Sequence, residues 1–475
     1  MSSQASSTLK SDLLALLSDP SSVIDDLEKR RFMGKDEWFA AAIPEIVVEP
    51  TTSQEVAAVL GYACDRHIPV TTRGAGYGYV GGCVPVHGGI LLSTVRLHRI
   101  LEIHPGDFIA VVQPAVITGT LQEAVRAQGL FYPPDPASLA HCSMGGNVAT
   151  NAGGPRCLKY GVTRNYVLGL EVALADGTLV RVGGRTHKNK TGFDLVGIFV
   201  GSEGLLGVIT EITLRLLPLP PAYATLSAGF KNMQEAAQAV QAIFASGFLP
   251  SAMEVADRFT LEAARHNLRN GPPLEIPPGN AHLLIEIDGQ EASVLGEIRA
   301  LEKLLVKKHA LKTHYATTPN SCDQMWNLRR SFSMALRATG LIKLNEDIVV
   351  PRSRLCDLFD FTEHLQKESG FQIACFGHAG DGNIHVNIMV SKGEYKEEQE
   401  KISLLLKTIF LQVLKWNGSI TGEHGIGLAK LPWWNEATSP AIRDLHSRLK
   451  LALDPDDILN PGKFVELPTA KSKAT

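Results

Sequence analysis

The residues of this 475-residue sequence that are best suited to chemistry lie in two glycine-flanked clusters near its C-terminal end. In the first, FQIACFGHAGDGNIHVNIMV at 371–390, two strand-like runs flank an Asp-Gly pair at 381–382. That pair is a strong hairpin signal, so we predict that His378 leaves one strand at the hairpin mouth and His385 enters the next. Asn387 follows two residues later and shares the strand face of His385. Three polar side chains are therefore expected to converge.

The second cluster is SITGEHGIG at 419–427, in which glycines stand on both sides of Glu423 and His424. Neighbouring residues of an extended segment point to opposite sides, so one of the two can ligate a metal while the other faces a substrate. A lone histidine is more often a solvated or hydrogen-bonded core residue, but the grouping reverses that preference. Two imidazoles and a carboxylate with open positions suit catalytic zinc, our first choice, or manganese or iron(II).

Four further clusters occupy the first half of the chain: RGAGYG at 73–78, PPDPAS at 133–138, GGNVATNAGG at 145–154 and GSEGLLGVI at 201–209. Glycines at this density let backbone N–H groups converge on an anion without Cβ atoms in the way. Each cluster alone is more often a set of tight turns. The spacing Gly74-x-Gly76-x-Gly78 is not the dinucleotide fingerprint, because its third glycine comes one position too early.

The elements that must position these clusters follow a strand–helix rhythm from Pro44 to about Leu217. Strands are expected at 46–50 and 68–74, with a helix at 53–67 whose N-cap is Ser53. The proline-rich segment 218–224 is the best domain boundary. Beyond it, strands are predicted at 225–230, 282–289 and 313–318, and helices at 232–246 and 293–309. This order suggests an open sheet with helices packed on one side.

We therefore predict a helical lead-in at 1–44, a first domain at 45–220, a second at 221–453 and a C-terminal segment at 454–475 that returns to the first domain. The length is two to three times that of a usual domain, which agrees with more than one core.

Composition excludes several classes of protein. The formal net charge is −3, from 46 basic and 49 acidic residues, which gives no electrostatic footprint for nucleic acid. Seven cysteines, an odd number without a CxxC pair, argue against a disulfide framework or an iron–sulfur cluster. The N-terminus does not read as a secretory signal, and no run of about 18 apolar residues occurs. We expect a cytoplasmic protein, with peripheral attachment to a membrane left open.

In this order, the four glycine-rich clusters resemble the FAD-binding domain of the vanillyl-alcohol oxidase superfamily. GHAGDGNIHVN, followed by TGEHGIG and LNPGK, is similar to the D-lactate, D-2-hydroxyglutarate and glycolate dehydrogenase branch of the FAD-linked oxidase family. Together these resemblances cover about 420 of the 475 residues. They imply an α+β fold, with a two-part FAD-binding domain and an α/β substrate domain that has an antiparallel sheet and covering helices.

The resemblance implies that the glycine-rich cluster at 73–78 binds the FAD pyrophosphate. It also implies that 133–138 and 145–154 line the flavin and ribitol, and that the Ile209 region approaches the adenine. Some members attach the flavin to a histidine, but Tyr77 and Tyr79 flank that position here, so we expect non-covalent FAD. The expected FAD contacts are Arg73, Gly74, Ala75, Gly76, Tyr77, Gly78, Pro134, Asp135, Ser138, Gly145, Gly146, Asn147, Thr150, Asn151, Gly153, Gly154, Ile209 and Asn460.

The same resemblance implies that the metal ligands are His378, His385 and Glu423, that His424 is the general base, and that Asn387 contacts the substrate. A substrate-carboxylate arginine follows a tryptophan in this branch, and MWNLRRSFSMALRATG supplies Trp326, Arg329 and Ser333 in that pattern. Arg329 and Ser333, four residues apart, share a helix face, whereas Arg330 is offset and expected in solvent. Lys343 is a further expected carboxylate contact.

The activity so implied is oxidation of a D-2-hydroxy acid to the 2-oxo acid, with hydride passing to flavin N5 and the hydroxyl proton to His424. We give D-lactate slight preference over D-2-hydroxyglutarate and glycolate, which share its hydroxy-carboxylate head. No haem or iron–sulfur motif occurs, so we expect an external acceptor, either a quinone, a cytochrome or an electron-transfer flavoprotein. A homodimer is allowed for.

Three alternatives compete with this interpretation. An oxygen-using oxidase of sugars or aromatic alcohols would not need the two-histidine, one-glutamate cluster. A non-catalytic flavin-binding subunit of an oxidase complex would be expected to lack that cluster or the second domain. A structural metal protein would leave residues 73–209 unexplained.

Overall fold

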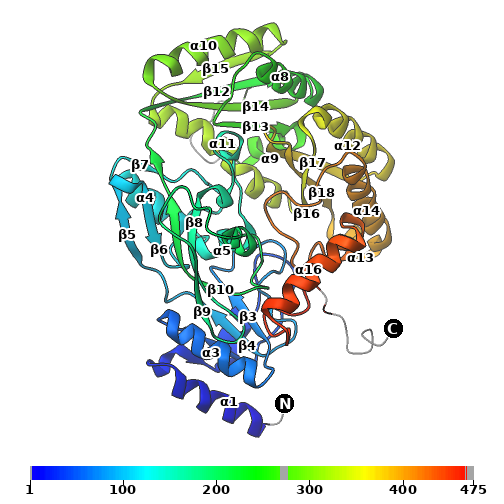
Figure 1. The fold of residues 1–475 in the computed structure, drawn as a ribbon. Helices are drawn as coiled ribbons and strands as arrows, with labels where there is room; N and C mark the ends of the chain where they lie inside the picture. The colour runs from blue at the N-terminus through cyan, green and yellow to red at the C-terminus, as the bar shows by residue number, and fades with distance from the viewer. Residues whose placement is uncertain (1–2, 268–276, 466, 468–475) are drawn as a thin grey trace. The chain divides into compact units, whose positions relative to one another are not determined.

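A computed structural model describes residues 3–267, 277–465 and 467 of the chain (Figure 1). The chain forms two compact units, and neither is a continuous stretch of sequence. The first unit comprises Met1–Gly153, Val162–Leu219 and Glu423–Thr475, and the second comprises Gly154–Gly161 and Pro220–Gly422.

The first unit contains a four-stranded sheet in the order β1-β2-β4-β3, a five-stranded antiparallel sheet in the order β5-β6-β10-β8-β9, and the pair β11-β7. Its helices and strands are α1 (Ser3–Leu16), β1 (Val23–Ile24), α2 (Leu27–Met33), β2 (Ile46–Val48), α3 (Ser53–Asp65), β3 (Val70–Arg73), β4 (Ile90–Ser93), β5 (Ile100–His104), β6 (Ile109–Val112), α4 (Thr118–Arg126), β7 (Leu130–Phe131), α5 (Met144–Thr150), β8 (Val167–Ala173), β9 (Leu179–Gly183), α7 (Leu195–Phe199), β10 (Val208–Arg215), β11 (Leu217–Pro218), α15 (Trp434–Ala437) and α16 (Pro440–Leu453).

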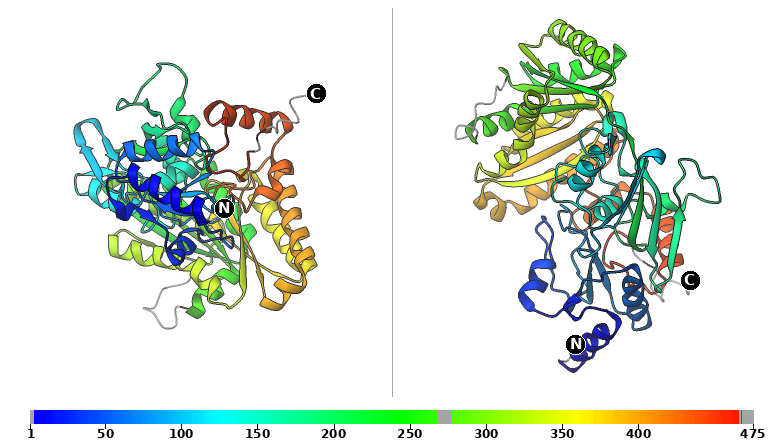
Figure 2. Two further views of the ribbon diagram at one scale, coloured as in Figure 1. Left: turned by 90° about the horizontal axis from the view of Figure 1, so that it is seen from below. Right: turned by 90° about the vertical axis from the view of Figure 1, so that its left-hand side faces the viewer.

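Strands β2, β4 and β3 run parallel and are almost wholly buried, as expected for a parallel sheet covered on both faces. Helix α3 begins at an N-cap whose side chain accepts the backbone N–H of Glu55. That cap is Thr52 rather than the predicted Ser53, which is the first helical residue. Helix α1 lies beside α3 (Figures 1 and 2). Its buried leucines belong to the same hydrophobic core as those of α3.

The second unit is built on one antiparallel sheet of seven strands, in the order β15-β12-β14-β13-β17-β18-β16 (Figure 1). Its helices and strands are α6 (Cys157–Tyr160), β12 (Ala222–Phe230), α8 (Met233–Ala245), β13 (Ala252–Asp257), α9 (Arg258–Asn267), β14 (Ala281–Gly289), α10 (Glu291–Lys307), β15 (Lys312–Ala316), α11 (Pro319–Arg337), β16 (Ile342–Val349), α12 (Leu355–Ser369), β17 (Gln372–His378), β18 (Asn383–Val390), α13 (Lys392–Glu397) and α14 (Gln399–Lys415).

Helices cover both faces of this sheet, whereas we predicted them on one side. Helix α10 contacts one face, where Thr313 Oγ1 donates to Glu302. Helix α11 contacts the other, where Trp326 Nε1 donates to Glu286 at 2.8 Å. The helix that carries Arg329 lies on the sheet face that bears buried polar groups. Sequence periodicity does not show which face of a sheet a helix covers, so the prediction of a single covered face was wrong.

Residues 154–161 form a strap that leaves the glycine-rich part of the chain and packs on β14. Arg156 makes a two-point ion pair with Glu286, with N–O distances of 2.9 and 3.1 Å. Asp288 accepts from Lys159 Nζ at 2.5 Å and from the Tyr160 hydroxyl at 2.7 Å. These contacts explain why the strap belongs to the second unit.

The chain returns to the first unit at Glu423, earlier than the predicted residue 454. The reason is that α16 packs in the first unit. The Lys450 ammonium is fully buried there and donates to the carbonyl oxygens of Leu205 and Leu459, as well as to the Asp454 carboxylate.

Candidate active site

The hairpin predicted around residues 381–382 is present. Strands β17 and β18 pair so that His378 lies opposite Asn383, and Phe376 lies opposite His385. His378 and His385 therefore face the same side of the sheet, and Asn387 joins them two residues further along. Gly382 has a φ of +85°, which favours glycine at the turn.

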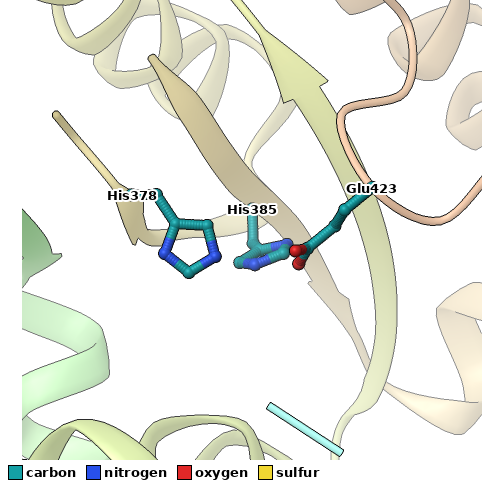
Figure 3. A group of neighbouring side chains, drawn as sticks. All are labelled: His378, His385 and Glu423. Carbon is teal, nitrogen blue, oxygen red and sulfur yellow. The ribbon is translucent and has the colours of Figure 1, made fainter. Parts of the chain in front are cut away.

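The two histidines lie beside Glu423, as Figure 3 shows. One ligand atom from each of the three residues lies within 4.8 Å of the other two. Both histidines are buried, and Glu423 is half-buried. Two imidazole nitrogens and a carboxylate oxygen at this spacing are a donor set that suits a divalent transition metal with open coordination positions. The residues therefore fit such an ion.

Asp347 holds the loop that leads to Glu423. This carboxylate, fully buried on β16, accepts Asn383 Nδ2 at 2.6 Å and the Gly422 backbone N–H at 2.9 Å. The Thr421 hydroxyl donates to it at 3.1 Å. A Cβ at Gly422 would collide with Asn383, so this close approach requires glycine. Sequence reasoning missed Asp347, whose only signal is a charged residue within an otherwise strand-like run.

Glu203 holds the loop that follows His424. Its carboxylate accepts the backbone N–H groups of Ile426 at 2.7 Å and Gly427 at 2.8 Å. Burial raises the pKa of the Glu203 carboxyl, although these two hydrogen bonds oppose the effect. The His424 ring lies 5.4 Å from that of Tyr79, centroid to centroid. Glu203 falls within a predicted flavin cluster, but its side chain binds the backbone of the loop that follows His424, the expected base.

Helix α11 places Arg329 and Ser333 on one side, where Arg329 is buried and Ser333 is half-buried. Arg329 Nε donates to Glu254 at 2.5 Å. Ser333 accepts from Lys343 Nζ at 2.8 Å, so two expected substrate contacts touch each other. Arg330 is exposed and pairs with Asp323 at the surface, which confirms its predicted position in solvent.

Lys343 is a half-buried ammonium group with other cations nearby. Burial lowers its pKa to about 7, and the nearby positive charges of Arg337 and Arg329 act in the same direction. The Phe376 ring centroid lies 6.0 Å from Lys343 Nζ and 5.1 Å from the Arg329 guanidinium carbon. A bound anion would relieve the repulsion between these cations, so the cluster is suited to a carboxylate.

Asn387 is fully buried in β18. Its Nδ2 donates to the carbonyl oxygens of Ala374 at 3.0 Å and His385 at 3.1 Å. Within the described residues, its Oδ1 has no hydrogen-bond partner. A buried acceptor without a donor is costly, and a substrate donor group would satisfy it.

Two of the predicted FAD clusters lie against each other in the first unit. Ala75 N donates to Ser143 Oγ at 3.2 Å, and a Cβ at Gly74 would lie 2.7 Å from that oxygen. A Cβ at Gly145 would lie 2.6 Å from the Pro114 side chain. Gly76 has a φ of +75°, and a Cβ there would collide with the Arg73 guanidinium. These glycines are therefore required by close approach, and a cradle of this kind fits a phosphate-bearing cofactor.

The fourth cluster joins the same assembly through the backbone. Glu203 N donates to Ala149 O at 2.8 Å, and Asn460 Nδ2 donates to the carbonyl oxygens of Gly82 and Glu203 at 2.9 Å. The Arg73 guanidinium contacts Lys35 O and lies 3.4 Å from Cys83 Sγ.

The remaining predicted FAD contacts occupy two loops, one helix and one strand. Pro134, Asp135 and Ser138 follow β7, and Pro134 O accepts Gln122 Nε2 at 2.9 Å. Ile209 lies in β10. The others belong to α5 or follow it directly: Gly146, Asn147, Thr150, Asn151, Gly153 and Gly154. Tyr77 and Gly78 lie in the loop after β3, where the Tyr77 ring stacks on that of His141 at 4.8 Å.

Comparison with known proteins identifies the class. An FAD-binding domain family matches residues 44–183, and a family described as FAD linked oxidases, C-terminal domain, matches residues 219–464. The chain is an FAD-linked oxidoreductase with the fold of vanillyl-alcohol-oxidase-type flavoproteins. It belongs to the FAD-linked oxidase family.

The relatives cover nearly the whole chain. Glycolate oxidase subunit GlcD of Bacillus subtilis is 37% identical over 423 residues, 89% of each protein. A D-lactate dehydrogenase of Archaeoglobus fulgidus is 36% identical over 420 residues, 88% of this chain and 91% of that protein. The structure of p-cresol methylhydroxylase with bound substrate superposes with a TM-score of 0.79 over 98% of both chains, at 18% identity, which supports the fold alone.

Proposed function

We propose that the protein oxidises a D-2-hydroxy acid to the corresponding 2-oxo acid, with D-lactate the preferred candidate and D-2-hydroxyglutarate and glycolate the alternatives. The observation that carries this proposal is the cluster of His378, His385 and Glu423, whose donor set suits a catalytic divalent ion, zinc by preference. Relatives named as D-lactate dehydrogenases and glycolate oxidase subunits support the substrate class.

When bound, non-covalent FAD supplies the two-electron acceptor, and a divalent ion supplies a Lewis acid for the substrate hydroxyl. His424 accepts the hydroxyl proton, because an imidazole can act as general base near neutral pH. Arg329 holds the carboxylate through a charge-assisted pair whose planar geometry a lysine would not reproduce. Lys343 adds a second cation, and Asn387, which shares a strand face with His385, contacts the substrate.

We further propose that an external quinone, cytochrome or electron-transfer flavoprotein re-oxidises the enzyme. We also propose that the enzyme is cytoplasmic, that it can form a homodimer, and that it can attach peripherally to a membrane. Among the described helices, none combines the length and apolar character needed to cross a bilayer.

The test is anaerobic bleaching of the flavin absorbance by a panel of D- and L-2-hydroxy acids, before and after chelation. We expect bleaching with one or more D-acids, and loss of that bleaching once metal analysis shows that the ion has been removed. Bleaching by L-acids alone would overturn the proposed substrate class. Undiminished bleaching after complete metal removal would overturn the role of the ion.

A further inference from the structure

One buried carboxylate beside this site has no role in the function described so far. Glu254 lies on β13 and is 1% exposed. Its Oε1 lies 2.6 Å from His378 Nδ1, and its Oε2 lies 2.5 Å from Arg329 Nε. Each oxygen therefore serves a different partner, one a proposed metal ligand and the other the proposed carboxylate anchor.

This arrangement follows from the strand register. Glu254 lies directly opposite His378 where β13 pairs with β17, so the two side chains share a face of the sheet. Helix α11 packs against that face and brings Arg329 to the second oxygen. An unpaired buried carboxylate would be strongly destabilising, so the two contacts also explain how Glu254 is tolerated in the core.

We propose that Glu254 is a positioning residue that fixes the metal-binding nitrogen of His378 and the orientation of Arg329 at the same time. A carboxylate beside Nδ1 holds a proton on that nitrogen, which directs the lone pair of Nε2 to the metal. A guanidinium held at Nε still has donors on its two terminal nitrogens, which can meet a substrate carboxylate side-on. The separation between the ion and the carboxylate anchor is thereby set by one side chain.

This inference rests on the proposed function, and its test uses metal binding by the full-length protein as well as activity. Glu254→Gln keeps the shape but places an N–H₂ group against one of two donors. We expect its zinc affinity, measured by competition with a chromogenic chelator, to fall about 10- to 100-fold. We also expect a rise in KM for the D-acid of about tenfold, because one charged hydrogen bond is lost from the orientation of Arg329.

The matched control is Asp257→Asn, a carboxylate-to-amide change on the same strand. Asp257 is half-buried and accepts backbone N–H groups of Thr260 and Cys375, but contacts neither His378 nor Arg329 in the described structure. Its substitution should lower thermal stability without changing zinc affinity. A purely structural role for Glu254 predicts the same behaviour for both variants.

Glu254→Asp provides a second variant if Glu254→Gln does not fold. It keeps the charge, but its shorter side chain cannot reach both partners, so weaker zinc binding is again expected. A folded Glu254 variant that binds zinc as tightly as the native protein would overturn the positioning role and leave the proposed function intact. A native protein that binds no zinc, manganese or iron(II) would overturn the metal in the proposed function, and this inference with it.

Discussion

The polar face of the seven-stranded sheet and the glycine cradle of the first unit are built on opposite principles. On the sheet, single buried carboxylates each hold two or more partners, as Glu254 holds His378 and Arg329, and as Asp347 holds Asn383 and Gly422. In the cradle, positions such as Gly74 and Gly145 have no room for a side chain at all. The first region is specified by which groups are present, and the second by which atoms are absent.

The largest expected effect is at the candidate active site, where chemistry depends on single side chains. His424→Ala should lower kcat about 10²- to 10⁴-fold, because general-base catalysis contributes that much. Flavin and metal contents should stay at native levels, since His424 is not one of the three residues proposed to bind the ion. Stopped-flow reduction with metal analysis would measure both. Near-native kcat would remove His424 as the base.

In the cradle, the test is to add an atom rather than remove one. Gly76→Ala introduces a Cβ at a φ of +75° and against the Arg73 guanidinium. A left-handed conformation alone costs a non-glycine residue about 1–2 kcal/mol, so we expect FAD affinity to fall about tenfold or more. Flavin content after dialysis gives the measurement. Gly184→Ala is the control, because a Cβ there meets no atom within 4 Å, and it should retain its flavin.

A smaller effect concerns the pH dependence of the sheet site. Because the pKa of Lys343 is lowered to about 7, its side-chain amino group is mainly charged below that pH and mainly neutral above it. If this cation binds the substrate, kcat/KM should decline several-fold as pH rises through about 7, because one charged hydrogen bond is lost. Lys343→Arg should remove the decline, since a guanidinium stays charged. An unchanged profile in that variant would exclude Lys343 from substrate binding.

The smallest effect is expected just outside the buried polar face. Arg330 follows Arg329 in the chain but is exposed and pairs with Asp323. Exposed ion pairs contribute about 0–1 kcal/mol to stability, so Arg330→Ala should change kcat/KM less than about twofold. Steady-state assays of this variant beside Arg329→Ala would show whether only the buried arginine affects kcat/KM. An equal loss of kcat/KM in both variants would contradict the proposal that Arg329, and not Arg330, binds the substrate.

The sequence predicted those parts of the molecule whose signal is local. An Asp-Gly turn and the two-residue period of a strand were enough to bring His378, His385 and Asn387 together. The four-residue spacing of Arg329 and Ser333 was enough to place them on one helix side. Both predictions rest on neighbours within about ten residues.

The carboxylates that hold the site were missed because their partners are remote in sequence. Glu254 lies 124 residues before His378, and Glu203 lies 223 residues before Ile426. The residues near Glu254 do not distinguish it from a surface residue, and the glycine cluster around Glu203 indicated a flavin loop rather than a contact with residues 426–427. Strand order and the choice of sheet face decide such pairings, and the local periodicity of the sequence predicts neither.

The strap at 154–161 has a consequence for any attempt to divide the protein. Because it joins the second unit between two stretches of the first, and because the chain returns at Glu423, the polypeptide passes between the units four times. No single truncation of the gene can therefore yield either unit intact. Deleting everything after Leu219 would leave Arg156 and Lys159 without their partners Glu286 and Asp288. It would also remove α16 with its buried Lys450.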